Sequence, residues 1–255
     1  MTARALPGIV TLSALTLAAA AAAAPPPAAQ APDGATVLRR VDENMGADNK
    51  VTTSEMIIRG RRGSRTVSSQ SWIQGRAKSF TEYLDPPREK GTKMLKLEDQ
   101  LWTYTPASDR TILISGHMLR QSVMGSDLSY EDMMEDQRLV ELYDAVIAGE
   151  ERLGGRPCWV LELTSRGGDI AYFRRKIWVD RERFVVLREE RFAKSGKLLK
   201  TTEVRNVERM KDRWVPTRVN FKDALKDGSG TEFIVKSMEF NAAIPEHLFT
   251  KASLR

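Results

Sequence analysis

Most of this chain is a succession of short segments in which apolar and polar residues alternate, separated by turn residues. Residues 51–59, 66–74 and 77–84 are the first of these segments, and glycines lie near their ends. Alternation with a period of two is typical of strands that have one buried and one solvated face. Because no helical pattern separates the segments, consecutive strands are expected to pair as hairpins, and the sheet is predicted to be antiparallel.

The same pattern continues towards the end of the chain. The further segments predicted to be strands are residues 91–98, 101–105, 110–114, 139–151, 158–165, 171–179, 184–192, 197–209, 214–222 and 231–240. Roughly a dozen strands in about 220 residues indicate a large curved or barrel-like sheet. The sequence therefore predicts a mainly β protein.

Within a segment, the alternation identifies the apolar face. Trp159, Leu161 and Leu163 share one face of their segment, whereas Glu162 and Thr164 share the other. Strands of this kind are half-buried, so the apolar face of the sheet needs a cover.

A helix is predicted at residues 35–45. Val37, Leu38 and Val41 fall at helical spacing, and Gly46 follows as a stop signal. We expect this amphipathic helix to lay its apolar face on the apolar, concave side of the sheet.

The first 24 residues have the pattern of a targeting segment. Arg4 supplies a positive charge, an apolar stretch follows at residues 9–17, and an alanine tract comes next. This order is typical of a secretory signal peptide, and we expect cleavage between about residues 22 and 31. The alternative is an N-terminal membrane anchor, which is disfavoured because the strongly apolar part is shorter than the ~20 residues that span a bilayer.

Residues 25–34 are rich in proline and alanine and are expected to form a flexible leader, and residues 35–255 are expected to form one domain. No cysteine lies near the signal segment, so lipid attachment at a cleavage-site cysteine is excluded. We therefore predict a soluble, exported, periplasmic protein. The 40 Lys and Arg residues only slightly outnumber the 34 Asp and Glu residues, which gives no indication of nucleic acid binding.

Residues that usually carry reactive chemistry are scarce. One cysteine excludes an internal disulfide, and two histidines far apart in sequence do not favour a metal site. Cys158, inside a predicted strand, is interpreted as a small buried apolar residue. The sequence contains no GxSxG, HExxH or phosphate-binding glycine motif, so it nominates no catalytic residue, metal or cofactor.

Two runs of like charge are interpreted as solvated surface. Residues 127–136 contain five carboxylates, but their spacing does not match an EF-hand loop, so a solvated helix face is favoured over a calcium site. Residues 59–65 contain four arginines at a predicted hairpin turn. A solvated turn is favoured there over a contact with phosphate or anionic lipid headgroups.

Several short motifs occur in a fixed order in the middle of the chain and at its end. They are DPP at residues 85–87, GT at 91–92, LWTYTP at 101–106 and MGSDLSYED at 124–132, and the chain closes with IPEHLFT at 244–250. These motifs resemble the outer-membrane lipoprotein-sorting family, the LolA/LolB-like superfamily. With the flanking strand pattern, the resemblance covers nearly all of the chain after the signal segment.

The resemblance implies a fold and a function. The fold is an unclosed antiparallel β-barrel of about eleven strands, a curved half-barrel with helices covering its concave side. The implied function is that of a periplasmic carrier, not an enzyme, which binds a lipid or the acyl chains of a lipoprotein in a hydrophobic cavity for transfer between the inner and outer membranes. The implied partners are an inner-membrane transporter component and an outer-membrane acceptor, and the carrier is expected to be a monomer.

Several residues are candidates for lining such a cavity. Trp102 and Tyr104 share a strand face, and four methionines lie between residues 118 and 134. Methionine adapts to irregular apolar ligands, although both groups are equally compatible with ordinary core packing. The predicted ligand-binding residues are Trp72, Phe80, Tyr83, Met94, Trp102, Tyr104, Ile112, Ile114, Met118, Met124, Leu128 and Met133.

Two segments are predicted to act as lids. The first is the helix at residues 35–45, through Val37, Leu38 and Val41. The second starts at Ser129, an expected N-cap followed by acids in the first turn, and contributes Tyr130.

Two other functions stay open. Some envelope-stress regulators share this implied fold and bind ligands in order to signal, so a ligand-binding sensor or regulatory domain is the main alternative. Such regulators tend to carry a second domain, for which the predicted mature length leaves little room. An uncharacterised hydrolase is the third reading, although no residue is available to nominate as its nucleophile.

Overall fold

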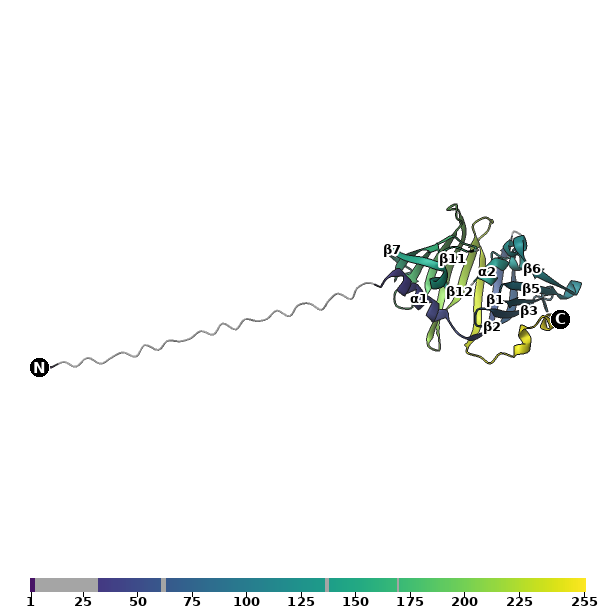
Figure 1. The fold of residues 1–255 in the computed structure, drawn as a ribbon, viewed down its shortest axis with the longest axis horizontal. Coiled ribbons are helices and arrows are strands. Elements are labelled where there is room, and N and C mark those ends of the chain that lie inside the picture. Colours follow the sequence, from purple (N-terminus) through teal and green to yellow (C-terminus); the bar gives the residue numbers. More distant parts are fainter. Residues whose placement is uncertain (3–31, 61–62, 136–137, 169) are drawn as a thin grey trace. The chain divides into compact units, whose positions relative to one another are not determined.

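In the described part of the chain, thirteen strands form one antiparallel sheet, which Figure 1 shows in a computed structural model. Hairpins join most strands to the next strand in the chain. In chain order the strands are β1 (Asn49–Gly60), β2 (Gly63–Gln74), β3 (Lys78–Asp85), β4 (Lys93–Leu97), β5 (Gln100–Thr105), β6 (Arg110–Ile114), β7 (Tyr143–Leu153), β8 (Arg156–Ser165), β9 (Arg174–Asp180), β10 (Val186–Phe192), β11 (Leu198–Met210), β12 (Arg213–Asp223) and β13 (Thr231–Phe240). They pair in the order β6-β5-β4-β3-β2-β1-β13-β12-β11-β10-β9-β8-β7. Strands β6 and β7 are therefore the two edges, and the sheet is unclosed.

The structure describes residues 1–2, 32–60, 63–135, 138–168 and 170–255. Residues Pro32–Arg255 form one compact unit. Within the described residues, the helices are α1 (Gly34–Met45), α2 (Tyr130–Met134) and α3 (Leu139–Leu142), with short 3-10 turns η1 (Pro106–Ser108), η2 (Gly116–Arg120), η3 (Val123–Gly125), η4 (Glu246–Phe249) and η5 (Lys251–Leu254). None of these helices has both the length and the apolar character needed to cross a membrane.

The fold class predicted from the sequence is confirmed, since the protein is mainly β with one unclosed antiparallel sheet. The sheet has thirteen strands where the resemblance implied about eleven. The strand predicted at residues 139–151 is wrong at its start, because Leu139–Leu142 form α3 and β7 begins only at Tyr143. Leu139 and Leu142 pack against the apolar cluster that includes α1. An apolar segment this short does not distinguish a strand from a helical turn by its sequence pattern.

Some predictions concern residues outside the described part of the chain. Residues 3–31 contain nearly all of the predicted signal peptide and most of the predicted leader. Residues 61–62 belong to the predicted basic turn, and residue 136 belongs to the carboxylate run.

Helix α1 lies on the concave side of the sheet, against strands near the β7 edge (Figure 1). The side chain of its N-cap, Asp33, accepts a hydrogen bond of 2.6 Å from the backbone N–H of Thr36. Gly34 begins the helix so close to β7 that an added Cβ would lie 2.4 Å from the carbonyl oxygen of Ala145. A residue with a side chain at this position would push the helix off the strand.

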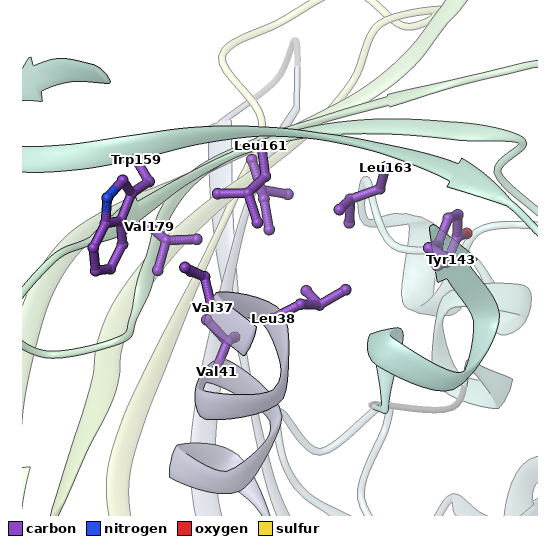
Figure 2. Packing of buried hydrophobic residues seen from close by; sticks show 9 residues of the cluster. Val37, Leu38, Val41, Tyr143, Trp159, Leu161, Leu163 and Val179 are labelled. Atoms are coloured by element: carbon purple, nitrogen blue, oxygen red, sulfur yellow. The ribbon is translucent and has the colours of Figure 1, made fainter. Parts of the chain in front are cut away.

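Packing between α1 and the sheet is apolar. Figure 2 shows Val37, Leu38 and Val41 pointing from the helix towards Leu161 and Val179 of β8 and β9. Leu38 and Leu161 have no exposed surface. These residues are the apolar positions at helical spacing and the apolar strand face that the sequence identifies, so the amphipathic helix and the half-buried strands satisfy each other.

The opposite face of the sheet has its own small core at the β6 edge. Phe80, Leu95 and Trp102 stand side by side on paired positions of β3, β4 and β5. Phe249 and Leu254 of the C-terminal turns η4 and η5 cover them. The closing motif IPEHLFT is thus a cover for the convex side of the sheet.

Candidate functional site

A cavity of about 490 Å³ lies between the concave face of the sheet, α1 and the segment that follows β6. We call residues 115–135 of that segment the crossing segment, because they run from edge strand β6 to contacts with β9, β10 and β11 at the far half of the sheet. The volume falls within the range of pockets that hold small-molecule ligands.

One part of the cavity wall is apolar. Phe221 of β12 and Phe233 of β13 pack edge to face, with ring centroids 6.4 Å apart. Methionines and aliphatic residues of the sheet and of the crossing segment, which includes α2, complete this part, namely Met56, Met94, Leu101, Leu128 and Met133. Tyr83 lies among them, and burial raises the pKa of its hydroxyl.

The cavity floor on β1, β2 and β3 carries short hydroxyl side chains instead. These residues are Thr52, Ser54, Ser69, Ser71, Ser79 and Thr81, hereafter the hydroxyl floor. They share one face because Thr52 pairs with Ser71, and Ser71 pairs in turn with Thr81, in the antiparallel register. The hydroxyl oxygens of Ser71 and Thr81 are 2.8 Å apart, and those of Ser54 and Ser69 are 3.1 Å apart.

A cluster of buried charges closes the other end of the cavity. Nη1 of Arg175 donates to Oε1 of Glu189 at 2.7 Å, and Nη2 of Arg191 donates to Oε2 of the same carboxylate at 2.9 Å. Burial by itself raises the pKa of Glu189, but the two guanidinium groups outweigh it and hold the pKa at about 2. Burial lowers the pKa of Arg175 to about 10, although Glu189 favours its charged form. Buried charges of this kind are tolerated because they pair with each other.

Helix α2 docks on this cluster through Asp132. Its Oδ1 accepts a hydrogen bond of 2.5 Å from the hydroxyl of Tyr172 and lies 3.1 Å from Nη1 of Arg191, and its Oδ2 pairs with Lys200. Asp132 also closes a capping box with Ser129, which starts the helix. Burial alone raises the pKa of Asp132, but Lys200 and Arg191 outweigh it and keep the pKa below its ordinary value.

Asp127 is the second docking point of the crossing segment. Its Oδ2 accepts a hydrogen bond of 2.8 Å from the hydroxyl of Thr231, and its Oδ1 accepts one of 3.0 Å from the backbone N–H of Asp223. The Lys200 ammonium donates to its carbonyl oxygen at 3.1 Å. The motif MGSDLSYED therefore contains residues that fasten this segment to β11, β12 and β13.

Some predicted ligand-binding residues lie at the cavity and others lie close behind it. Tyr83, Met94, Leu128 and Met133 line the cavity. Ile114, Met118 and Met124 belong to the same apolar cluster without lining it. Whether any of them contacts a ligand stays a prediction.

Four predicted aromatic residues lie away from the cavity. Trp72, Phe80, Trp102 and Tyr104 belong to the convex core beneath the C-terminal turns. The alternation puts them there, because Met94 and Thr103 are paired concave positions and Trp102 and Tyr104 therefore point the other way. Ile112 is on edge strand β6 and is 43% exposed.

The predicted lid residues have different positions. Val37 and Leu38 are buried against β8 and β9, and Val41 reaches the cavity. Tyr130 packs at the margin of the apolar cluster under the crossing segment.

Sequence reasoning missed the charged cluster and the hydroxyl floor. Arg175 lies two positions before Ile177 on β9, so its place on the apolar face was available from the alternation. Ser69 and Ser71 likewise alternate with outward residues along β2. Polar residues at positions where the period requires apolar ones were the signal.

No group of three or more His, Cys, Asp or Glu residues in the described ranges is arranged to hold a metal ion. Cys158 is fully buried, and burial raises the pKa of its thiol. The site therefore consists of apolar walls, hydroxyl groups and paired charges, which suit binding.

A family model described as "Uncharacterized protein" matches residues 75–255. This chain belongs to that family. No curated protein matches its sequence. The fold is similar to that of a DUF1329 family protein from Desulfovibrio piger, which has 24% identity and a TM-score of 0.78, covering 87% of this chain and 98% of that chain.

Two further solved structures relate this fold to the LolA superfamily. An outer membrane lipoprotein-sorting protein domain from Vibrio parahaemolyticus has 24% identity and a TM-score of 0.75, covering 87% of this chain and 97% of that chain. A LolA superfamily protein from Nitrosomonas europaea has 23% identity and a TM-score of 0.73, covering 88% of this chain and 100% of that chain. The fold is LolA-like, as the sequence motifs predict.

Proposed function

We infer that this protein is a periplasmic carrier that holds a lipid, or the acyl chains of a lipoprotein, in the cavity under the crossing segment. The observation that carries this proposal is a sizeable cavity with an apolar wall inside a sheet that never closes. Each acyl methylene exposed to water costs about 0.8 kcal/mol, so a carrier needs such a shielded space. The LolA-like fold and the name of the Vibrio structure support the same function.

The chemistry of the site supports binding without catalysis. The acidic and basic groups around Glu189 are held as ion pairs, and the pKa of Glu189 is about 2, which is far from the range of a general base at neutral pH. The ligand enters and leaves when the crossing segment moves, because this segment covers the cavity and is fastened to the far half of the sheet by the polar contacts of Asp127 and Asp132. A membrane component supplies the donor or acceptor, and the carrier works as a monomer.

Filling the cavity tests this function. Ser71 faces the cavity from β2, so Ser71→Trp places a large side chain in open space. Gln70, its neighbour on the other face of β2, provides the matched control Gln70→Trp. We expect the unaltered protein to bind a fluorescent fatty-acyl probe, Ser71→Trp to weaken binding at least tenfold, and Gln70→Trp to leave it unchanged.

The readouts separate folding from binding. Circular dichroism and thermal unfolding establish that each variant is folded, and mass spectrometry of organic extracts of the exported protein identifies any bound lipid. Absence of lipid from the extracts together with no probe binding would exclude the carrier function. A folded Ser71→Trp variant that binds the probe normally would show that binding occurs elsewhere.

A further inference from the structure

We propose that the hydroxyl floor is a subsite for the uncharged ester groups of an acylated glycerol, so that the polar part of the ligand lies inside the cavity. The inference rests on the proposed carrier function and adds the class of ligand. A site for bare hydrocarbon chains would need only apolar walls, and this cavity has six hydroxyl side chains on three adjacent strands.

Among the described residues, some O–H groups of the hydroxyl floor do not donate to another side chain. In the Ser71–Thr81 pair one hydroxyl donates to the other, so one O–H of the pair stays available, and the same holds for Ser54 and Ser69. Within the described part of the chain, the hydroxyl of Thr52 makes no hydrogen bond to another side chain. The floor therefore presents several O–H donors to whatever occupies the cavity.

Desolvation makes these donors selective. A hydroxyl that loses water without gaining a partner costs about 1–3 kcal/mol in proteins. A bare alkyl chain laid over the floor would leave the free donors unpaired, whereas ester carbonyl oxygens would accept from them. The floor thus favours a ligand segment that is rich in hydrogen-bond acceptors.

The charged cluster around Glu189 favours an uncharged segment, and the buried Lys50 ammonium, which also lines the cavity, lies 3.5 Å from the carbonyl oxygen of Met45. Arg175 and Arg191 form ion pairs with Glu189, Glu135 and Asp132, so carboxylates already balance the guanidinium charges, although the Nε–H of each arginine has no hydrogen-bond partner within the described residues. A phosphate or carboxylate placed beside them would meet three buried carboxylates, and an unpaired buried charge is strongly unfavourable. Ester groups need hydrogen bonds and no counter-ion.

The arrangement of the walls matches an acylated glycerol. Thr81 pairs directly with Met94 of β4, so the hydroxyl floor meets the apolar wall within one strand spacing. Esters on the floor would direct their chains towards Met94, Leu101 and Phe233, under Leu128 of the crossing segment. The same ester chemistry occurs in membrane glycerolipids and in diacylglyceryl lipopeptides.

The experiment removes hydroxyls while keeping shape. The variant Thr52→Val/Ser71→Ala/Thr81→Val takes three hydroxyls from the floor, and Thr53→Val, on the other face of β1, is the control. Three probes are compared on the full chain: a pyrene-labelled alkane, a fluorescent diacylglycerol and a synthetic diacylglyceryl lipopeptide. We expect the triple variant to lose about fivefold or more in affinity for an ester-bearing probe and to bind the alkane equally well or more tightly.

Each outcome decides a different point. A loss for the diacylglycerol alone assigns the subsite to membrane lipid, and a loss for the lipopeptide alone assigns it to lipoprotein. Unchanged affinity for both esters, or an equal loss for the alkane, would overturn the subsite and leave the carrier function standing. If the unaltered protein binds none of the three probes, the carrier function itself fails.

Discussion

The two covers of the concave face use different chemistry. Helix α1 is held by apolar side chains, because Val37 and Leu38 are fully buried against β8 and β9. The crossing segment buries Val123 and Leu128, but it is also held by Asp127 and Asp132, which bind hydroxyl, amide and cationic groups of the sheet. Apolar contacts have no substitute in water, whereas water replaces hydrogen bonds and ion pairs at small net cost.

This difference teaches which cover is able to move. Local opening draws on the parts of a protein that bury few apolar contacts. Opening α1 would expose the apolar cluster around Leu161. Opening the crossing segment would break the hydrogen bonds and ion pairs of Asp127 and Asp132, although it would also expose the buried side chains of Val123 and Leu128. We expect α1 to be a permanent part of the fold and the crossing segment to be the gate of the cavity.

The largest effect is expected from Leu38→Ala. Leu38 has no exposed surface, so its truncation should lower the free energy of unfolding by about 2–5 kcal/mol. Chemical denaturation measures this loss, and Arg39→Ala, an exposed position on the same helix, should change stability by less than about 0.5 kcal/mol. Hydrogen exchange in the crossing segment should rise only as far as global unfolding requires. Faster exchange of α1 at unchanged global stability would show that α1, too, opens locally.

Acid should open the crossing segment before it affects α1. Glu189 has a pKa of about 2 instead of 4.5, and the pKa of Asp132 is also lowered. Carboxylates with depressed pKa values stabilise the fold above their ordinary pKa, and this contribution disappears as pH falls from about 4.5 towards 2. Protonation removes their attraction to Arg175, Arg191 and Lys200.

Hydrogen exchange at decreasing pH, corrected for the intrinsic exchange rate, measures this opening. Residues 123–135 should lose protection in the interval between pH 4.5 and 2 while α1 keeps its own. The effect should exceed that of any one carboxylate substitution, because the pKa values of Asp132 and Glu189 are both lowered and falling pH removes the stabilising charge of both. Simultaneous loss of protection in both covers would remove the distinction between them.

A smaller effect is expected from Asp132→Ala at neutral pH. The substitution leaves Lys200 and the hydroxyl of Tyr172 without this carboxylate, which costs about 1–3 kcal/mol for buried polar groups. The loss should appear as increased exchange of the crossing segment and faster release of a bound acyl probe. Asp144→Ala, which removes an exposed ion pair to Arg166, is the control and should change neither rate.

Much of this fold was predictable from the sequence, and the gate was predictable only in part. Val37, Leu38 and Leu161 follow strict periods, and period alone decides which face is buried. Trp102 also followed its period, but the choice between the two faces depends on which one is concave, and that is a property of the whole sheet. Asp132 was interpreted as a solvated helix residue, because its partners Arg191 and Lys200 are some sixty residues away on strands whose pairing sets the contact.

The smallest effect sharpens the comparison most, because one kind of substitution is available in both covers. Ser129 caps α2 and Asp33 caps α1, and replacing either by alanine should cost about 1 kcal/mol. In α1 this loss should appear in the global free energy of unfolding, since α1 unfolds with the sheet. In α2 it should appear as roughly fivefold faster exchange of residues 129–134, with little change in global stability. Denaturation and hydrogen exchange of both variants test whether the crossing segment opens independently of α1. If both covers respond in the same way, they behave as one cooperative unit, and the crossing segment is not a separate gate.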